Sequence, residues 1–241
     1  MLAFLWGMAL GFSWTAHAQE PGDFVINPAI LLEANASGSG YMINGVASPT
    51  VVHDSIRDRY IMVFEVRLPE EDDACPVGLF ALGIAYSDDG IAWEPAEEPL
   101  LRPEEGTFYN CVAAHPNAVF NPTRDRMYVV FKGEQSSDAC DESEPDWGCD
   151  QYTGVGRLRV EFDADGEIVE KFTPRNPILA VGQNFGWPKV VSSGSYWYLM
   201  FTRQPDAMLT RGVKLSDMRV PDEAAITPTS LVSWANDEIV N

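Results

Sequence analysis

The sequence predicts an all-β fold made of repeated four-stranded units, and three observations lead to that prediction. Nineteen glycines and seventeen prolines are spread along the 241 residues, which favours many short strands and turns over long helices. Apolar residues make up 46% of the chain, enough to fill a buried core. The third and most informative observation is an internal repeat with an offset of 67 residues.

The repeat aligns three landmarks without a gap. The pairs Pro49 and Pro116, Arg57 and Arg124, and Phe64 and Phe131 are each 67 residues apart. A third copy, from Pro188 to Phe201, needs a two-residue deletion in its turn. A fixed period of this length indicates a repeat architecture.

Each copy begins with the pattern of a β-hairpin. Residues 47–64, 114–131 and 186–201 start with a short strand, turn through polar residues and return along an aromatic-rich strand. The return strands are apolar at consecutive positions, which is typical of strands covered on both faces. Stacked sheets provide such cover.

Further strands complete each copy. Third strands are expected at residues 79–86, 155–162 and 212–215, and fourth strands at residues 100–101 and 178–179. Four-stranded sheets repeated at this period are the blades of a β-propeller. Three blades are visible, and residues 229–240 are expected to open a fourth.

The first eighteen residues are expected to form a signal peptide. They contain no Lys, Arg, Asp or Glu, residues 2–12 are almost wholly apolar, and Ala16-His17-Ala18 has the small-x-small pattern of a cleavage site. The apolar run is shorter than the ~20 residues of a membrane span. We therefore expect a secreted or periplasmic protein whose propeller domain covers residues 19–241, the alternative being a buried N-terminal helix.

The formal net charge of −20 limits the partners of the chain. Such a field repels nucleic acid and anionic membranes, so neither is expected as a partner. A neutral ligand such as a carbohydrate, or a cation, is compatible with it. The acidity is equally consistent with solubility in a salty habitat.

Four cysteines in an exported chain indicate disulfides. Their spacing does not match a zinc site. Cys140 and Cys149 bracket a short loop and are the easiest pair to join, which leaves Cys75 with Cys111 by elimination. The sequence alone allows three connectivities.

The loop at residues 138–150 is rich in carboxylates. Oxygen-rich clusters can bind Ca²⁺, although this spacing does not match an EF-hand. The alternative is an acidic, solvated loop closed by a disulfide. No other metal and no cofactor are expected.

The strand and turn motifs resemble those of one group of enzymes. A residue-Pro-x-Val strand, an aromatic strand and the turn Ser87-Asp88-Asp89-Gly90 leading to Trp93 are similar to the five-bladed propellers of glycoside hydrolase families 43, 32, 62 and 68. The resemblance covers about residues 41–235 and implies a carbohydrate ligand. Five units of this length need more residues than the chain has, so we expect further blades beyond its C-terminal end or from elsewhere.

The catalytic carboxylates of the resembled families have no counterparts here. In those families an Asp directly precedes the Pro of the first blade, another Asp lies in the second, and a Glu in the third donates the proton. This sequence has Ser48, His115 and Trp187 directly before its three repeat prolines. None of them is a carboxylate, whereas hydrolysis of a glycosidic bond requires a pair.

Hairpin pairing offers substitutes, because the start of the first strand meets the end of the second. Polar side chains at those ends are therefore expected beside the residues before the prolines. They are Glu65 near Ser48, Lys132 and Glu134 near His115, and Arg203 near Trp187.

These residues define a candidate site with two roles. The expected acid and base residues are Glu65, Glu134 and His115, and the expected substrate-binding residues are Ser48, Trp187, Asn117 and Arg203. The alternatives are solvated strand ends or salt bridges for the glutamates, and a core position for Trp187. The sequence supports two functions: a glycoside hydrolase with relocated acids, or a carbohydrate-binding propeller without catalysis. A secreted scaffold without a sugar site is a third.

Export generates the first testable prediction. Because cleavage is expected after Ala18, N-terminal sequencing of the secreted protein should begin at Gln19. Mature protein that retains Met1 would contradict the prediction.

Overall fold

The computed structural model describes residues 40–42, 44–70, 72, 75, 78–121, 123–135, 153–180, 185–193, 196–203, 210–215 and 231–234. After residue 178, side chains are described only at residues 187–190 and 199. The expected signal peptide, the acidic loop and the Cys140–Cys149 pair lie outside the described residues. Residues Leu31–Asn241 form one compact unit that contains every described element. Within the described residues, no helix is long and apolar enough to span a membrane.

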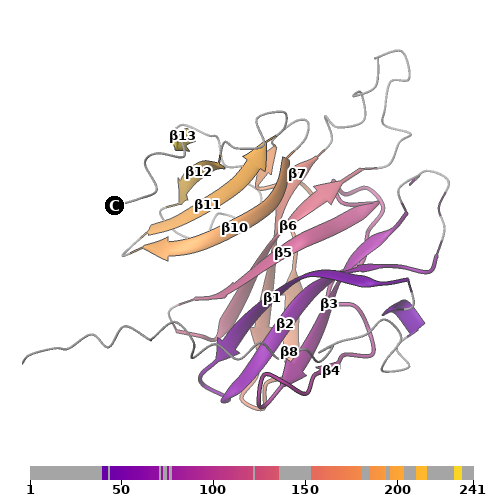
Figure 1. Ribbon diagram of the computed structural model, residues 1–241, viewed down its shortest axis with the longest axis vertical. Helices are drawn as coiled ribbons and strands as arrows, with labels where there is room; N and C mark the ends of the chain where they lie inside the picture. Colours follow the sequence, from indigo (N-terminus) through magenta and orange to yellow (C-terminus); the bar gives the residue numbers. More distant parts are fainter. Residues whose placement is uncertain are drawn as a thin grey trace, which may run out of the picture. The chain divides into compact units, whose positions relative to one another are not determined.

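The described elements are strands, apart from one short 3₁₀ helix, η1 (Gly40–Met42), so the predicted all-β fold is confirmed (Figure 1). The first unit contains β1 (Val46–Asp54), β2 (Arg59–Arg67), β3 (Phe80–Ser87) and β4 (Glu94–Pro95). The second contains β5 (Val112–Phe120), β6 (Arg126–Glu134), β7 (Gly154–Phe162), β8 (Ile168–Phe172) and β9 (Leu179–Ala180). The third contains β10 (Phe185–Ser193), β11 (Tyr196–Arg203), β12 (Thr210–Leu215) and β13 (Leu231–Trp234).

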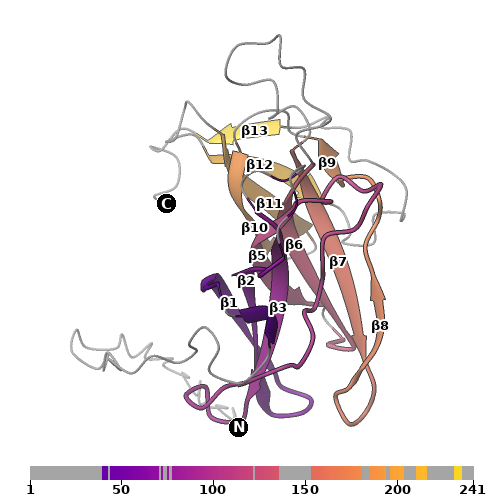
Figure 2. The same ribbon diagram turned by 90° about the vertical axis from the view of Figure 1, so that its right-hand side faces the viewer.

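Within each unit, neighbouring strands pair antiparallel in chain order, except that β9 pairs with β7 and not with β8. The first two units also share one sheet, because Phe80 in β3 pairs in parallel with Val112 in β5. The third unit is a separate sheet in the order β10-β11-β12-β13. In both views β5 lies beside β1 and β10, the first strands of the neighbouring units (Figures 1 and 2).

Two expectations about the outer strands are corrected. The described part of residues 229–240 is strand β13, which does not open a fourth unit because it pairs with β12 in the third sheet. In the first unit, Leu101 forms only an isolated bridge with Leu82, and the strand beside β3 is β4. The pairing of β9 with β7 agrees with the fourth strand predicted near residues 178–179.

The repeated phenylalanines pack over glycines of the neighbouring strand. Phe64 pairs with Gly83, and Phe131 pairs with Gly156. A Cβ atom would lie 2.3 Å from the Phe64 ring at Gly83, and 2.2 Å from the Phe131 ring at Gly156. Each ring therefore occupies the space of the missing side chain, which explains the repeated aromatic position.

The repeated arginines join the turn ends of the first two units. Arg124 Nη1 donates to the His53 carbonyl at 2.8 Å, and Arg57 Nε donates to the Asp163 carbonyl at 3.0 Å. Arg57 is held in turn by Asp54, whose side chain is completely buried, at 2.7 Å. The Arg landmarks of the sequence are therefore structural.

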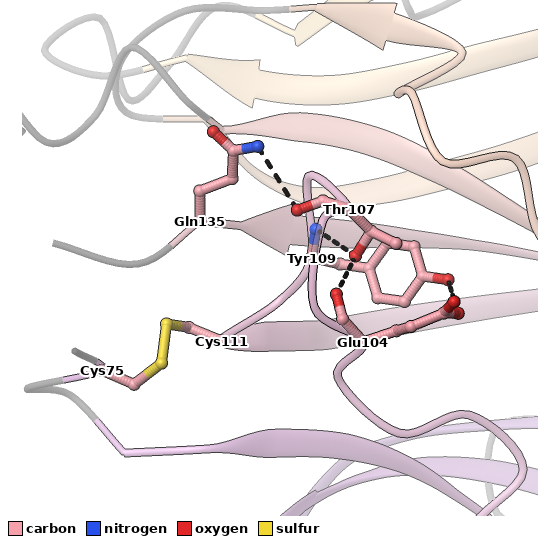
Figure 3. Close-up of a disulfide and its surroundings, with 6 residues drawn as sticks. All are labelled: Cys75, Glu104, Thr107, Tyr109, Cys111 and Gln135. Atoms are coloured by element: carbon pink, nitrogen blue, oxygen red, sulfur yellow. Dashed lines mark hydrogen bonds between the residues drawn. A yellow bond between two sulfur atoms is a disulfide. The ribbon is translucent and has the colours of Figure 1, made fainter. Parts of the chain in front are cut away.

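A disulfide links the segment before β3 to the residue directly before β5. Cys75 and Cys111 are bonded (Figure 3). Both are buried, and they pack with Phe80 and Val112. The pairing inferred by elimination is confirmed for these two cysteines.

The packing of Phe131 over Gly156 generates the second prediction. Gly156→Ala should lower the free energy of unfolding by about 1–3 kcal/mol, because the added methyl group overlaps a buried ring. Denaturant unfolding measures the loss. The control is Gly40→Ala, because among the described residues other than its chain neighbours no atom lies within 4 Å of the position of its Cβ. Equal stability of the two variants would contradict the packing argument.

Candidate functional site

Three equivalent residues have an unusual backbone conformation. Ser48, His115 and Trp187 have φ angles of 51°, 51° and 49°, and each directly precedes the repeat proline of its strand. Positive φ costs an L-residue about 1–2 kcal/mol. Strain that recurs at one repeat position indicates a functional constraint.

Each of these residues lies in a β-bulge. The register shifts between Ala47 and Thr50 in β1, between Ala114 and Asn117 in β5, and between Gly186 and Lys189 in β10. Proline cannot donate to a ladder, and a bulge redirects the side chains within it. The prolines that mark the repeat in the sequence therefore mark the bulges that redirect the preceding residue.

The redirected side chains come together as the sequence predicted. Ser48 Oγ lies 3.2 Å from Nδ1 of His115. The His115 and Trp187 ring centroids are 5.5 Å apart, with the rings tilted by 45°. Trp187 is 54% exposed, which is unusual for so large an apolar side chain. It therefore offers a free aromatic surface beside His115.

Glu65 joins this group from the end of β2. It pairs with Ala47, so hairpin register alone brings it next to Ser48. Its Oε2 accepts a hydrogen bond from the His115 backbone N–H at 3.1 Å and lies 3.3 Å from Nδ1 of that ring. Glu65 thus connects the first unit to the second.

A pocket of about 220 Å³ opens beside His115. Lys132 and Glu134 form an ion pair in it, and they stand in β6 opposite Ala114 and Val112. Both predicted carboxylates therefore face one pocket. Its lining residues are Glu65, Phe80, Val112, Ala114, His115, Lys132 and Glu134.

The surroundings of His115 lower its pKa from the usual 6.5. Burial has the largest effect and lowers the pKa, and Lys132 and Lys189 lower it further. The carboxylates of Glu65 and Glu134 act in the opposite direction without reversing the shift. The imidazole is therefore neutral at neutral pH, which leaves one ring nitrogen able to accept a hydrogen bond.

The positions of Ser48 and Glu65 exclude one familiar mechanism. In a Ser-His-acid hydrolase the serine and the carboxylate contact opposite nitrogens of the imidazole. Here both lie at Nδ1 of His115. The charged carboxylate is the stronger acceptor, which favours a proton on Nδ1 and a lone pair on Nε2. Ser48 is therefore not arranged as a nucleophile activated by His115.

The described pocket lining contains none of the predicted substrate-binding residues: Ser48 and Trp187 lie beside it, next to His115. Asn117 uses its amide within the protein, since Oδ1 accepts from the Val190 N–H at 2.7 Å and Nδ2 donates to Thr50 Oγ1 at 3.4 Å. Arg203 ends β11, where its backbone pairs with Phe185, and its side chain lies outside the described residues.

Sequence reasoning missed the apolar wall of the pocket. Ala114 directly precedes His115, so its place is a local consequence of the strand. Phe80 reaches the pocket through the parallel contact between β3 and β5, which has no local signature. In the part of the chain that the structure describes, no three His, Cys, Asp or Glu side chains gather as a metal site requires.

Comparisons with known proteins identify the fold. No family model and no curated protein matches the sequence. Three solved structures are similar at low sequence identity. The RS223 β-xylosidase has a TM-score of 0.53 and 12% identity over 86% of this chain and 60% of that one. A GH43_1 enzyme from Xanthomonas citri in complex with xylotriose has a TM-score of 0.52 and 12% identity, and the match covers 84% of this chain and 58% of that one.

The third is Zg3597, a family 117 glycoside hydrolase from the marine bacterium Zobellia galactanivorans, with a TM-score of 0.51 and 13% identity over 71% of this chain and 52% of that one. The chain thus spans about half to three fifths of the length of these three proteins. Such identities show the fold alone. The chain has the all-β fold of the β-propeller glycoside hydrolases, which confirms the resemblance that the repeat and the Ser87 to Trp93 turn predicted.

Proposed function

We propose that the protein binds a carbohydrate at the candidate site, defined as Ser48, His115, Trp187 and the pocket beside them. The observation that carries the proposal is the exposed Trp187 ring, held in a strained conformation next to His115. A flat aromatic face suits the C–H surface of a sugar ring, and a few fixed polar groups suit its hydroxyls. Enzymes of the same fold that act on saccharides add support.

The pocket has the polar groups that hydroxyl recognition needs. Glu65 and Glu134 can accept hydrogen bonds, and Lys132 can donate them. Neutral His115 can accept a hydrogen bond at Nε2, because its Nδ1 already faces Ser48 and Glu65. Phe80 and Val112 add apolar contact. Lys132 and Glu134 form an ion pair, and a saccharide without charge is not repelled by the net charge of −20.

Hydrolysis of that saccharide is the second candidate function. It is favoured by one observation, namely that Glu65 and Glu134 line a single pocket, as a general acid and a general base must. Both carboxylates are already engaged, Glu65 by the His115 backbone and Glu134 by Lys132. Catalysis would need one of them to exchange its protein partner for water or the glycosidic oxygen. Binding needs no such exchange, so the geometry supports it more directly.

Removal of the aromatic face tests the binding proposal. Trp187→Ala should weaken oligosaccharide binding by at least about thirtyfold, the effect expected for a dominant contact residue. Titration calorimetry with a panel of neutral oligosaccharides measures the affinity. Ile56→Ala is the matched control, because this side chain is 58% exposed and lies in the turn at the other end of β1. A wild-type protein that produces no heat with any saccharide would contradict the proposal.

The same panel separates binding from hydrolysis. If Glu65→Gln or Glu134→Gln removes turnover and leaves binding intact, the protein is a hydrolase with relocated acids. Binding by the wild type without turnover of any substrate would support the non-catalytic function.

The environment of His115 generates a prediction about pH. Titration by NMR should give His115 a pKa below 6.5, and Glu65→Gln should lower that pKa further, because the lost carboxylate raises it. The unfolded chain then binds a proton below about pH 6.5 that the folded chain does not, so His115 should make stability fall as the pH drops through that range. A pKa at or above 6.5 in the wild type would contradict the description of this environment.

A further inference from the structure

A repeated hydrogen bond links the first strands of successive units. Thr50 Oγ1 in β1 accepts from the Ala118 N–H in β5 at 3.3 Å, and Asn117 Oδ1 in β5 accepts from the Val190 N–H in β10 at 2.7 Å. Thr50 and Asn117 each lie two residues after the strained residue of their strand. Ala118 and Val190 each lie three residues after theirs. We call these two contacts the inter-unit hydrogen bonds.

A third contact makes them continuous. Asn117 Nδ2 donates to Thr50 Oγ1 at 3.4 Å, so one chain of polar contacts runs from β1 through β5 to β10. Lys189 occupies the equivalent position in β10, and its ammonium group can only donate. Of the three equivalent residues Thr50, Asn117 and Lys189, only the first two can therefore accept a hydrogen bond through their side chains.

The inter-unit hydrogen bonds replace missing sheet pairing. Among the described strands, β1 pairs along its length only with β2, β5 only with β6, and β10 only with β11, apart from one parallel contact at Val112. Ala118 and Val190 are nonetheless buried. A buried N–H group without a partner costs about 1–3 kcal/mol, so these side-chain acceptors are required where the ladder has none.

The same bonds hold each strand directly after its bulge. Thr50, Asn117 and Lys189 are the residues at which regular pairing resumes beyond the strained positions. A bond at this point limits how far one bulge can move relative to the next. It therefore sets the spacing of Trp187 and His115. Trp187 lies three residues before Val190, and His115 lies two residues before Asn117, the residues that this bond joins.

We propose that Asn117 is a positioning residue that holds Trp187 against His115 and does not itself contact the ligand. The consequence for binding rests on the proposed carbohydrate site, whereas the consequence for ring geometry does not. This role differs from the substrate-binding role that the sequence suggested for Asn117, because its amide is used between strands.

A matched pair of variants tests the proposal. Thr50 performs the accepting role in β1 with a hydroxyl group, so Asn117→Thr should preserve the bond to Val190. Asn117→Val has nearly the same shape as the threonine variant and no acceptor, so it should lose the bond. The comparison isolates the hydrogen bond from side-chain volume.

The readout is the NMR signal of the His115 ring, which lies within the ring current of Trp187. Asn117→Val should shift that signal toward its position in Trp187→Ala, and Asn117→Thr should leave it near the wild type. The internal reference is His53, whose ring lies beside Tyr60 near the turn end of β1. Its signal should stay unchanged in both variants, and the remaining histidine, His17, lies in the expected signal peptide.

Binding should follow the ring signal. A single hydrogen bond contributes about 0.5–1.5 kcal/mol, so Asn117→Val should weaken oligosaccharide binding by about twofold to tenfold, with Asn117→Thr close to the wild type.

Three results would overturn the positioning role: an unchanged His115 signal in Asn117→Val, equal shifts in the two variants, or a His53 signal that moves together with that of His115. Failure of the proposed function is distinct from these results. If the wild type binds no saccharide while the ring signals behave as expected, the carbohydrate site is wrong and the positioning role of Asn117 stands.

Discussion

The candidate site depends on one backbone constraint, the positive φ of the residue before proline in β1, β5 and β10. Each bulge removes its residue from regular pairing and directs the side chain toward those of the other units. The strain costs about 1–2 kcal/mol per residue, and surrounding contacts must offset it. The Glu65 bond to the His115 backbone and the inter-unit hydrogen bonds act at these places.

The first strand of each unit, namely β1, β5 or β10, has different kinds of residue at its two ends. At the turn end, Arg57 and Arg124 occupy equivalent positions and both join neighbouring units through backbone carbonyls. At the bulge end the equivalent residues are Ser48, His115 and Trp187, which have unrelated chemistry. The turn end keeps one residue type, although the two acceptor carbonyls lie at different positions in their units, whereas the bulge end has a different group in each unit. This contrast supports a functional role for the bulge end.

The chemistry of the site comes from the return strands. The residues before the prolines contain no carboxylate, and Glu65 and Glu134 enter the pocket from the ends of β2 and β6. Between them, His115 stays neutral because burial outweighs the attraction of the two carboxylates for a proton. A neutral imidazole and a charge-balanced ion pair suit the recognition of hydroxyl groups.

The sequence by itself determined the strand units and the place of Glu65 and Glu134, because hairpin pairing is local and a repeat reveals its register. It also indicated the Cys75–Cys111 pair, by elimination. Only the tertiary structure showed that β13 completes the third sheet, that Phe80 forms a wall of the pocket, and that Asn117 spans two strands. These features depend on contacts between units, which are set by the packing of segments distant in the chain. No local pattern of residues records that packing.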